Sequence, residues 1–329
     1  MKRLFSLTVT AIITLSVLVA FAGCSKQGAE NKVLIYHSSE DYRIQYFSDE
    51  LKAKFPNYDI QFEYLSSGDH VARIVSEGKG TLCDITFDLE YGYAPKAEPF
   101  LADLSKYDFS KYAVDAVLPS RKLLPELRLG GCIAINSSML KSKGLAVPNT
   151  YEDLLKPEYK SLISMPNPKS SGTGYIFLKS LVNAWGEEKA FEYFDRLSKN
   201  VLHFTTSGMG PINDIVAGEA VIGLAMTPQA VTEINKGVDI EVKFFAEGSP
   251  FTFYGIGIID GKQNRKAVQE VFNYFIDVLV EEDKKLYYPE KIYKDKDFNI
   301  DNYPSNIKYS DMSGNTSDEK TRLLEKWEH

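Results

Sequence analysis

Short β-rich runs alternate with segments of helical periodicity along most of this chain, and this alternation limits the possible folds more than any other feature. Residues 33–36 form the first apolar run, and apolar residues then recur at helical spacing up to Phe55. The pattern continues with a strand at residues 60–64, a helix at 70–77 and a buried strand at 82–87. Alternating strands and helices with short loops are typical of a parallel, doubly wound sheet. The sequence therefore predicts an α/β protein.

A second α/β lobe is predicted to begin near Leu129, because the same alternation starts again there. The chain of 329 residues is also longer than one ordinary domain. The expected strands of this lobe are residues 131–135, 162–165, 201–204 and 220–226, and its expected helices are residues 151–155, 178–185, 191–197, 212–216 and 229–236.

The C-terminal third is expected to link the two lobes and to complete the first. Residues 240–245 and 251–259 are predicted strands that cross between lobes, and residues 268–279 form a strongly amphipathic helix. A capping box at Thr316 begins a final helix, which we expect to pack on the outside of a lobe. The predicted division is lobe 1 at residues 32–122 and 250–329, and lobe 2 at residues 123–249.

The N-terminus has the pattern of an export signal. Lys2 and Arg3 precede an apolar run that ends in small residues just before Cys24. The run is also about long enough for a transmembrane helix, but the small residues and the polar stretch that follows favour cleavage. The segment resembles a bacterial lipoprotein signal, although Phe21 stands where that pattern has leucine, so simple secretion is the alternative.

We therefore predict a signal peptide at residues 1–23, lipidation of Cys24 and a flexible tether over residues 24–31. The protein would then be held on the outer face of the cell membrane or in the periplasm. Removal of Lys2 and Arg3 changes the formal net charge from -7 to -9, which excludes a general attraction for nucleic acid.

Two further cysteines, Cys83 and Cys132, each lie in an apolar, strand-like run. An exported protein can form a disulfide between such residues, but isolated strand cysteines are more often small buried hydrophobic residues. The chain has no C-x-x-C spacing, and we predict neither a metal site nor a cofactor.

The loop at residues 170–174, Ser-Ser-Gly-Thr-Gly, joins a predicted strand directly to a predicted helix. The first N–H groups of a helix have no partner within it and carry partial positive charge, so a loop of this kind favours an anion. The alternative is a serine or threonine that caps the helix and binds nothing. Similar hydroxyl-rich loops at residues 38–39, 66–68 and 206–208 also precede helices, and they are expected to meet at the carboxyl ends of the strands.

Patterns that signal catalysis are missing from the sequence. The loop at residues 170–174 matches neither a Walker A motif nor G-x-G-x-x-G, and the chain contains neither G-x-S-x-G nor H-E-x-x-H. His37 and His203 end predicted strands and have three open interpretations: hydrogen bonding in loops, ligand contact, or metal binding and catalysis. Asp88 and Glu90 follow the third strand, where they would accept a hydrogen bond from a ligand hydroxyl or amine, or form a solvated pair. We predict that the protein is not an enzyme.

Several segments together resemble a known family: residues 33–36, 72–74, 83–85, 151–160, 168–175 and 217–220. The chain is similar to the extracellular solute-binding proteins of ABC importers for ferric iron, hexose phosphate, phosphonate and thiamine phosphate. The resemblance covers nearly all of the mature chain to about Val280, and residues 151–175 are its most specific part.

The resemblance implies two doubly wound α/β lobes of the periplasmic-binding-protein type II, joined by crossing strands near residues 119–130 and 246–256. It also implies a ligand in the cleft between them, hinge closure on binding, a monomer, and a membrane permease and an ATPase as partners. Ferric-binding members have adjacent tyrosines where this chain has residues 225–229, so those tyrosines are missing there. The adjacent pair Tyr287 and Tyr288 is expected to pack within the polar tail.

An organic phosphate or phosphonate is therefore the predicted ligand, and ferric iron or another metal is the first alternative. An exported phosphatase and a surface protein that binds only other proteins are further alternatives. The predicted ligand-binding residues are Ser38, Ser39, Ser67, Asp88, Glu90, Ser170, Ser171, Gly172, Thr173, Gly174, Tyr175, Thr206, Ser207, Gly208 and Tyr254.

Overall fold

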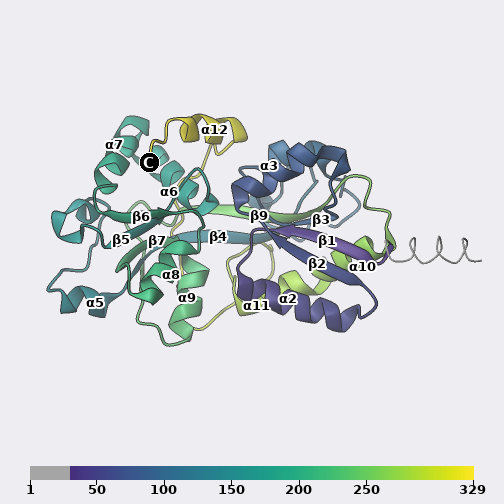
Figure 1. Ribbon diagram of the computed structural model, residues 1–329, viewed down its shortest axis with the longest axis horizontal. Coiled ribbons are helices and arrows are strands. Elements are labelled where there is room, and N and C mark those ends of the chain that lie inside the picture. Colours follow the sequence, from purple (N-terminus) through teal and green to yellow (C-terminus); the bar gives the residue numbers. More distant parts are fainter. Residues whose placement is uncertain (1–29) are drawn as a thin grey trace, which may run out of the picture.

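One mixed β-sheet runs through both lobes of the molecule (Figure 1). The structure is a computed structural model that describes residues 30–329. Eight strands lie in the order β2-β1-β3-β9-β4-β7-β5-β6, and β8 pairs with β4 beside this path. The strands are β1 (Lys32–His37), β2 (Asp59–Tyr64), β3 (Ile85–Glu90), β4 (Leu124–Ile135), β5 (Ile163–Pro166), β6 (Val201–Thr205), β7 (Ile222–Met226), β8 (Glu241–Lys243) and β9 (Phe251–Ile258).

Parallel pairing within each lobe is combined with antiparallel pairing where the lobes meet. In lobe 1, β1 pairs parallel with β2 and β3, and in lobe 2, β5 pairs parallel with β6 and β7. The long strands β4 and β9 pair antiparallel with each other and with the neighbouring strands of both lobes. They extend from one lobe to the other in Figure 1 and are the crossing strands. The predicted fold class is confirmed.

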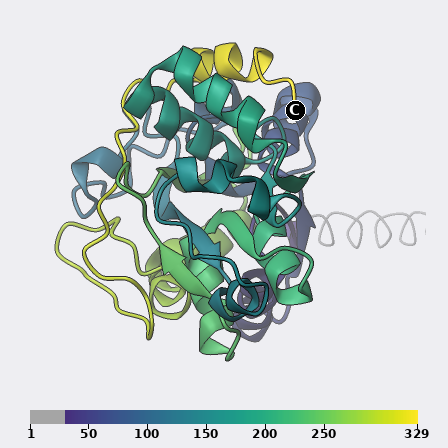
Figure 2. The ribbon, with the colours of Figure 1, turned by 90° about the vertical axis from the view of Figure 1, so that its left-hand side faces the viewer.

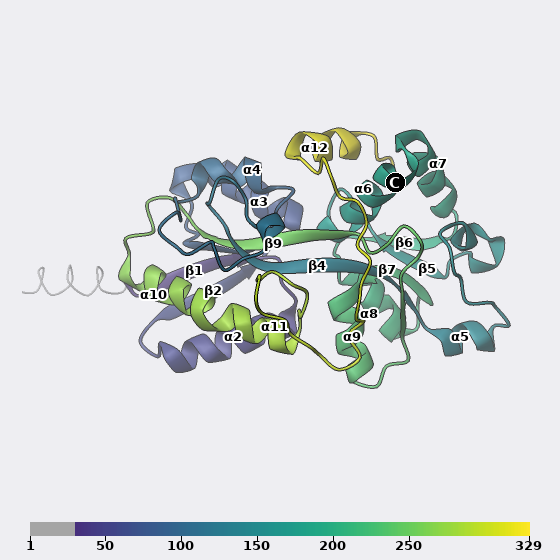
Figure 3. The same ribbon diagram turned by 180° about the vertical axis from the view of Figure 1, so that it is seen from behind.

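Helices cover both faces of the sheet in each lobe, as expected for a doubly wound fold (Figures 1 and 3). The helices α3 and α4 lie on one face of lobe 1 and α2, α10 and α11 on the other, while α6 and α7 lie opposite α8 and α9 in lobe 2. Their bounds are α2 (Asp41–Lys54), α3 (Ser67–Glu77), α4 (Ala94–Ala97), α5 (Ser137–Ser142), α6 (Gly172–Trp185), α7 (Glu187–Leu197), α8 (Gly210–Ala217), α9 (Thr227–Asn235), α10 (Lys266–Tyr274), α11 (Val280–Leu286) and α12 (Ser317–Glu325).

Each lobe has its own main hydrophobic core. In lobe 1, Phe47 and Phe87 pack against Phe272 and Phe275 of the helical segment that begins at Lys266. In lobe 2, the apolar face of α6 packs against β5 and β7, with Ile176 and Leu224 fully buried. Burial of apolar surface is the main term that favours folding, so each lobe has its own source of stability.

The third strand starts later than the sequence predicts. The prediction covered residues 82–87, whereas β3 is Ile85–Glu90 and the Leu82 side chain is 75% exposed. Cys83 is buried in the preceding loop, and both Cys83 and Cys132 are free thiols. The shift moves Asp88 and Glu90 into the strand, where both side chains are buried.

The C-terminal segment crosses the back of the molecule before it ends in α12 (Figures 2 and 3). As the capping box predicts, the Thr316 side chain accepts a hydrogen bond from the Glu319 backbone N–H at the start of this helix. The sequence division placed residues 250–329 in lobe 1, whereas Leu323 and Trp327 of this segment join the core of lobe 2. Residues 250–329 therefore contribute to both lobes.

The predicted signal peptide, the lipidation site Cys24 and most of the predicted tether lie outside the residues that the structure describes. Over residues 30–329, the structure contains no helix that is both long and apolar enough to cross a membrane.

Candidate functional site

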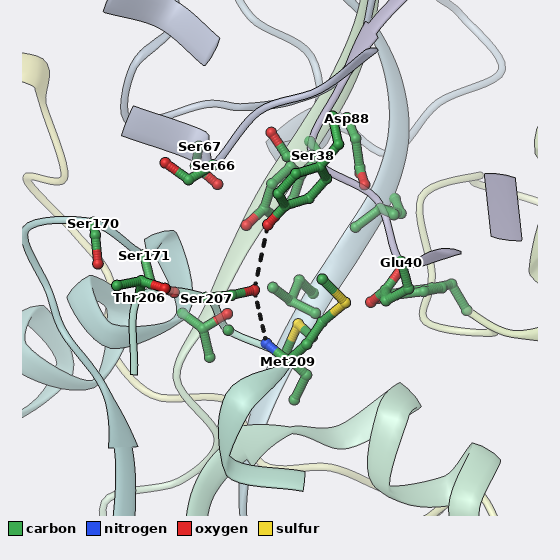
Figure 4. A pocket seen from close by; sticks show the side chains of 18 residues that line it. Ser38, Glu40, Ser66, Ser67, Asp88, Ser170, Ser171, Thr206, Ser207 and Met209 are labelled. Atoms are coloured by element: carbon green, nitrogen blue, oxygen red, sulfur yellow. Dashed lines mark hydrogen bonds between the residues drawn. The ribbon is translucent and has the colours of Figure 1, made fainter. Parts of the chain in front are cut away.

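A pocket lies between the lobes, where the carboxyl ends of strands from both lobes face one another (Figure 4). This is the position at which ligands bind in open α/β sheets. Its lining contains six serines, two threonines and three tyrosines, so it is rich in hydroxyl groups. The lining residues are Ser38, Glu40, Tyr64, Ser66, Ser67, Asp88, Leu127, Leu129, Ser170, Ser171, Thr173, Thr206, Ser207, Gly208, Met209, Met226, Tyr254 and Tyr288.

The loop after β5 brings the N-terminus of α6 to the pocket. Ser171 precedes the helix, and its hydroxyl accepts a hydrogen bond of 3.4 Å from the Gly174 backbone N–H. The Ser171 cap leaves the amides of Gly172 and Thr173 without partners inside the helix. A Cβ atom on Gly174 would overlap the Pro166 carbonyl oxygen, so this tight strand-to-helix turn requires glycine. The predicted anion loop therefore faces the pocket.

The loop after β6 lies beside the α6 loop. Ser207 accepts a hydrogen bond of 3.3 Å from the Met209 backbone N–H, and the Thr205 hydroxyl donates to the Ser207 carbonyl at 2.8 Å. A Cβ atom on Gly208 would collide with the Thr173 hydroxyl, so glycine allows the two loops to touch. Across the pocket, the Tyr64 hydroxyl of lobe 1 lies 3.4 Å from the Ser207 hydroxyl, which links the two lobes.

In lobe 1, two hydroxyl-bearing loops follow β1 and β2. Ser38 forms a hydrogen bond of 3.0 Å with Nδ1 of the buried His70. The Ser66 hydroxyl accepts a hydrogen bond of 3.4 Å from the Asp69 backbone N–H and thereby caps α3. Tyr254 reaches the pocket from the crossing strand β9, and burial raises the pKa of its phenol well above the usual value. Both loops therefore form walls of the pocket, and the loop after β2 also caps α3.

A buried guanidinium organises the acidic side of the pocket. Arg43 on α2 is fully buried and forms ion pairs with four carboxylates: Glu40 at 3.2 Å, Asp88 at 3.0 Å, Glu126 at 3.1 Å and Asp283 at 2.8 Å. Glu40 and Asp88 also line the pocket. Burial raises the pKa of the Glu40 carboxyl and raises that of Glu126 well above its usual range. Lone charges are costly to bury, so this cluster depends on Arg43.

Three side chains among the predicted contacts do not line the pocket. Both carboxylate oxygens of Glu90 have partners: one accepts from the Thr252 hydroxyl at 2.7 Å, and the other pairs with the Lys320 ammonium. Tyr175 is buried beneath the same Lys320. Ser39 donates a hydrogen bond of 2.6 Å to Asp88 and lies behind it. Glu90, Tyr175 and Ser39 therefore support neighbouring residues instead of facing a ligand.

The glycines Gly172 and Gly174 are likewise absent from the lining, although their loop is present in it. The remaining ten predicted residues do line the pocket: Ser38, Ser67, Asp88, Ser170, Ser171, Thr173, Thr206, Ser207, Gly208 and Tyr254. Whether these residues bind a ligand remains a prediction.

Sequence reasoning left several lining residues out of the predicted set: Glu40, Tyr64, Ser66, Leu127, Leu129, Met209, Met226 and Tyr288. The expectation that Tyr288 packs within the polar tail is wrong, because its buried hydroxyl donates a hydrogen bond to Glu40 in the pocket. One sequence feature could have placed Glu40 at the pocket: it lies in a serine-containing loop directly before α2. Tyr288 carries no comparable local signal.

The histidines lie outside the pocket lining. Nδ1 of the buried His37 accepts a hydrogen bond of 3.3 Å from the Ser39 backbone N–H, and burial lowers the His37 pKa to about 4. His203 is largely exposed and lies 3.2 Å from Asp214. Over residues 30–329, no three His, Cys, Asp or Glu side chains form a group placed to hold a metal ion.

Comparison with known sequences identifies a family. A family model described as bacterial extracellular solute-binding protein matches residues 131–309, which is more than half of the chain. An uncharacterized protein of Haemophilus influenzae is 27% identical over 270 residues, which cover 77% of this chain and 76% of that protein.

Comparison with solved structures gives the same fold. The periplasmic binding protein AfuA of Actinobacillus pleuropneumoniae, with fructose-6-phosphate bound, has a TM-score of 0.76 at 22% identity, covering 90% of this chain and 97% of its own. Iron-bound HitA of Pseudomonas aeruginosa has a TM-score of 0.74 at 14% identity, covering 89% and 98%. A periplasmic thiamin-binding protein has a TM-score of 0.70 at 15% identity, covering 90% and 95%.

Proposed function

Because the chain belongs to the family of bacterial extracellular solute-binding proteins, we propose that it captures a small organic anion bearing a phosphate or phosphonate group. Proteins of this family are substrate-binding components of ABC importers and work with a membrane permease and an ATPase. They bind solutes and are not enzymes. For this chain we propose that a monomer delivers the captured solute to such a permease. A lipidated Cys24 would hold this monomer on the outer face of the cell membrane or in the periplasm.

The convergence of hydroxyl-rich loops with the N-terminus of α6 is the observation that carries the anion assignment. Ser170, Ser171 and Thr173 line one side of the pocket, next to Thr206 and Ser207. Helix N-termini offer unpaired N–H groups and the positive end of the helix dipole, and hydroxyls supply further donors. The negative net charge of the chain does not oppose this, because distant charges are screened beyond about 8 Å at physiological salt.

Hinge closure is the proposed mode of capture. The pocket is lined from both lobes, and β4 and β9 run between them, so a bend in these strands would open and close it. The proposed lobes are residues 32–122 and residues 123–249, and residues 250–329 contribute to both. The hydrogen bond between Tyr64 and Ser207 spans the pocket and would break on opening.

Ferric iron is the alternative ligand, because HitA shares the fold and contains iron. A phenol must lose its proton to bind a metal. Burial raises the pKa values of Tyr254 and Tyr288 well above the usual range, and the neighbouring Glu40 adds to the effect at Tyr288. Burial therefore favours the neutral phenol at two of the three pocket tyrosines as long as no metal ion is bound. Over residues 30–329, no group of three His, Cys, Asp or Glu side chains is placed to hold a metal ion, which supports the phosphate or phosphonate ligand over iron.

Titration calorimetry of the purified protein tests the proposal. The compounds to compare are phosphate monoesters, alkyl phosphonates, thiamine phosphate and ferric citrate. We expect heat of binding, and an increase in melting temperature, with at least one phosphate or phosphonate compound. Binding of ferric citrate alone would reject the anion assignment, and it would favour the iron alternative.

A further inference from the structure

The pocket of this protein has two chemically different sides. The hydroxyl-rich loops around Ser170 and Thr206 lie on one side, and Glu40 and Asp88 lie on the other (Figure 4). Glu40 and Asp88 are the only charged side chains in the lining formed by the described residues. A ligand that is only an anion would therefore bring its charge into a pocket that contains two carboxylates and no charged basic side chain.

Asp88 lines the pocket and carries a buried acceptor atom that has no hydrogen-bond partner among the described residues. Its side chain is 5% exposed, and its Oδ2 atom accepts hydrogen bonds from the Ser39 hydroxyl at 2.6 Å and from Arg43 at 3.0 Å. Within residues 30–329, its Oδ1 atom has no hydrogen-bond partner. A carboxylate oxygen can only accept hydrogen bonds, and leaving a buried acceptor unpaired is costly. A ligand that enters the pocket when the lobes open would supply the donor that the Oδ1 atom lacks.

The backbone holds this carboxylate in place. Asp88 has a φ of 61°, in the left-handed region that non-glycine residues seldom adopt. Its backbone N–H donates a hydrogen bond of 2.9 Å to Glu126. Asp88 also lies at the irregular point where the pairing of β3 with β9 shifts register between Thr86 and Leu89. The surrounding structure thus maintains an uncommon conformation that turns Asp88 toward the pocket.

The charges behind Asp88 do not balance. Four carboxylates surround Arg43, and within residues 30–329 the other buried cation beside them is Lys284, next to Asp283 in the chain. Two cations therefore face four acidic groups. Burial shifts the Glu40 and Glu126 carboxyls toward their protonated forms, which relieves part of this excess. A cationic group bound at Asp88 would relieve more of it without the loss of any existing contact.

We propose that the ligand carries an ammonium group opposite its phosphate or phosphonate, and that this ammonium donates a hydrogen bond to Oδ1 of Asp88, beside Glu40. The inference depends on the proposed function for the anionic end of the ligand. Ammonium is favoured over hydroxyl because it satisfies the free oxygen and also supplies the missing positive charge. Asp88 is thus assigned as the residue that selects the ligand by its charge.

Three small phosphate esters separate the two ends of the ligand. Phosphoethanolamine, 2-hydroxyethyl phosphate and ethyl phosphate share the phosphate and differ in the other end, which is an ammonium, a hydroxyl or a methyl group. Calorimetry with the full protein should show phosphoethanolamine binding about ten-fold or more tightly than either of the others, as expected for a charge-assisted hydrogen bond. Equal affinities, or tightest binding of 2-hydroxyethyl phosphate, would overturn the inference while leaving the proposed function intact.

Substitution of Asp88 tests the assignment of the residue. Asn tolerates the left-handed backbone, so Asp88→Asn should lower the ratio of the phosphoethanolamine and ethyl phosphate affinities to about one, since an amide lacks the charge. Asp49→Asn makes the same change in net charge at an exposed position of lobe 1 and should leave the ratio unaltered. If the ratio of the two affinities is unchanged in Asp88→Asn, a group other than Asp88 selects the ammonium. If none of the three esters binds but another phosphate or phosphonate compound does, this inference fails and the proposed function stands. If no phosphate or phosphonate compound binds, both fail.

Discussion

At the residue scale, several side chains line the pocket and also contact a neighbouring structural residue. Thr173 lies on α6, lines the pocket and contacts Gly208 of the adjacent loop. Ser38 lines the pocket and also bonds the buried His70. A substitution that changes the shape of either side chain would therefore alter both the pocket and the local packing, so mutational tests need a measurement of stability beside that of affinity.

The Thr173→Val variant should bind a phosphate ligand more weakly by about 1.5 to 3 kcal/mol, because a hydrogen bond to a charged group is lost. Valine has nearly the same shape, so the melting temperature should change little. Calorimetry of the variant, beside Thr150→Val at an exposed position of the same lobe, measures the effect. An unchanged affinity would show that this threonine does not contact the anion.

His70 should make the folded protein sensitive to acid. It is fully buried between Ser38 and Thr86, and burial lowers its pKa from 6.5 to about 3. Below pH 6.5 the unfolded chain binds a proton here that the folded chain does not, so stability falls as pH decreases toward 3. Between pH 6.5 and pH 5 the loss at this site should be about 2 kcal/mol.

Urea unfolding across this pH range tests the effect of His70. His37, whose pKa is lowered to about 4, should add to the slope in the same direction. A His70→Gln variant should show a shallower dependence on pH than the parent. Parallel curves for the parent and His70→Gln would contradict the argument.

At the element scale, α12 shows how a polar C-terminal segment becomes part of a core. Thr316 caps its start, and Leu323 and Trp327 enter the core of lobe 2. The Trp327 ring packs edge-on against Phe194, with 5.3 Å between ring centroids, and against Phe204 at 5.7 Å. Aromatic pairs of this kind contribute beyond the area that they bury. The helix is thus an integral part of lobe 2.

The Trp327→Ala variant should lower the free energy of unfolding by about 3 to 5 kcal/mol, because a large buried side chain is removed and leaves a cavity. The half-buried Leu324, on α12 just before Trp327, gives the comparison, and Leu324→Ala should cost clearly less. Chemical denaturation of both variants measures the difference. Similar losses in the two variants would mean that α12 is held mainly by its surface contacts.

At the scale of the whole molecule, Lys320 of α12 connects the lobes beside the pocket. Its ammonium pairs with Glu90 of lobe 1, lies 3.5 Å from the Tyr93 ring centroid and 4.5 Å from that of Tyr175 in lobe 2, and is 2% exposed. A buried ion pair contributes little net stability, but the removal of one partner leaves a buried charge alone. Replacing only one residue of the Lys320–Glu90 pair should therefore lower stability, whereas replacing both together should cost much less.

The Lys320→Met variant should lose about 3 to 5 kcal/mol of stability, because Glu90 is left buried without its partner. The double variant Lys320→Met with Glu90→Gln should recover most of this loss. Urea unfolding of the parent, the two single variants Lys320→Met and Glu90→Gln, and the double variant gives the coupling energy, with the exposed Lys326→Met as control. If the second substitution adds to the first instead of compensating for it, the two residues are not coupled.

Much of the fold could be predicted from the sequence, because strands and helices leave local periodic signals. The α6 loop was predicted at the pocket for the same reason, since a hydroxyl-rich turn between a strand and a helix is a local pattern. The sequence could not show in this way which of Asp88 and Glu90 faces the pocket. Both residues follow the same predicted strand, residues 82–87. In the structure Asp88 lines the pocket, whereas Glu90 pairs with Lys320, which lies 230 residues further along the chain.

The sequence by itself determined the alternation of strands and helices, the two lobes and the hydroxyl-rich loops at the carboxyl ends of strands, because each depends on residues close together in the chain. Only the tertiary structure decided that Tyr288 reaches Glu40 across 248 residues, that α12 joins lobe 2, and that Asp88 retains a free acceptor. Contacts between distant residues depend on how the whole chain packs, so local sequence patterns do not predict them.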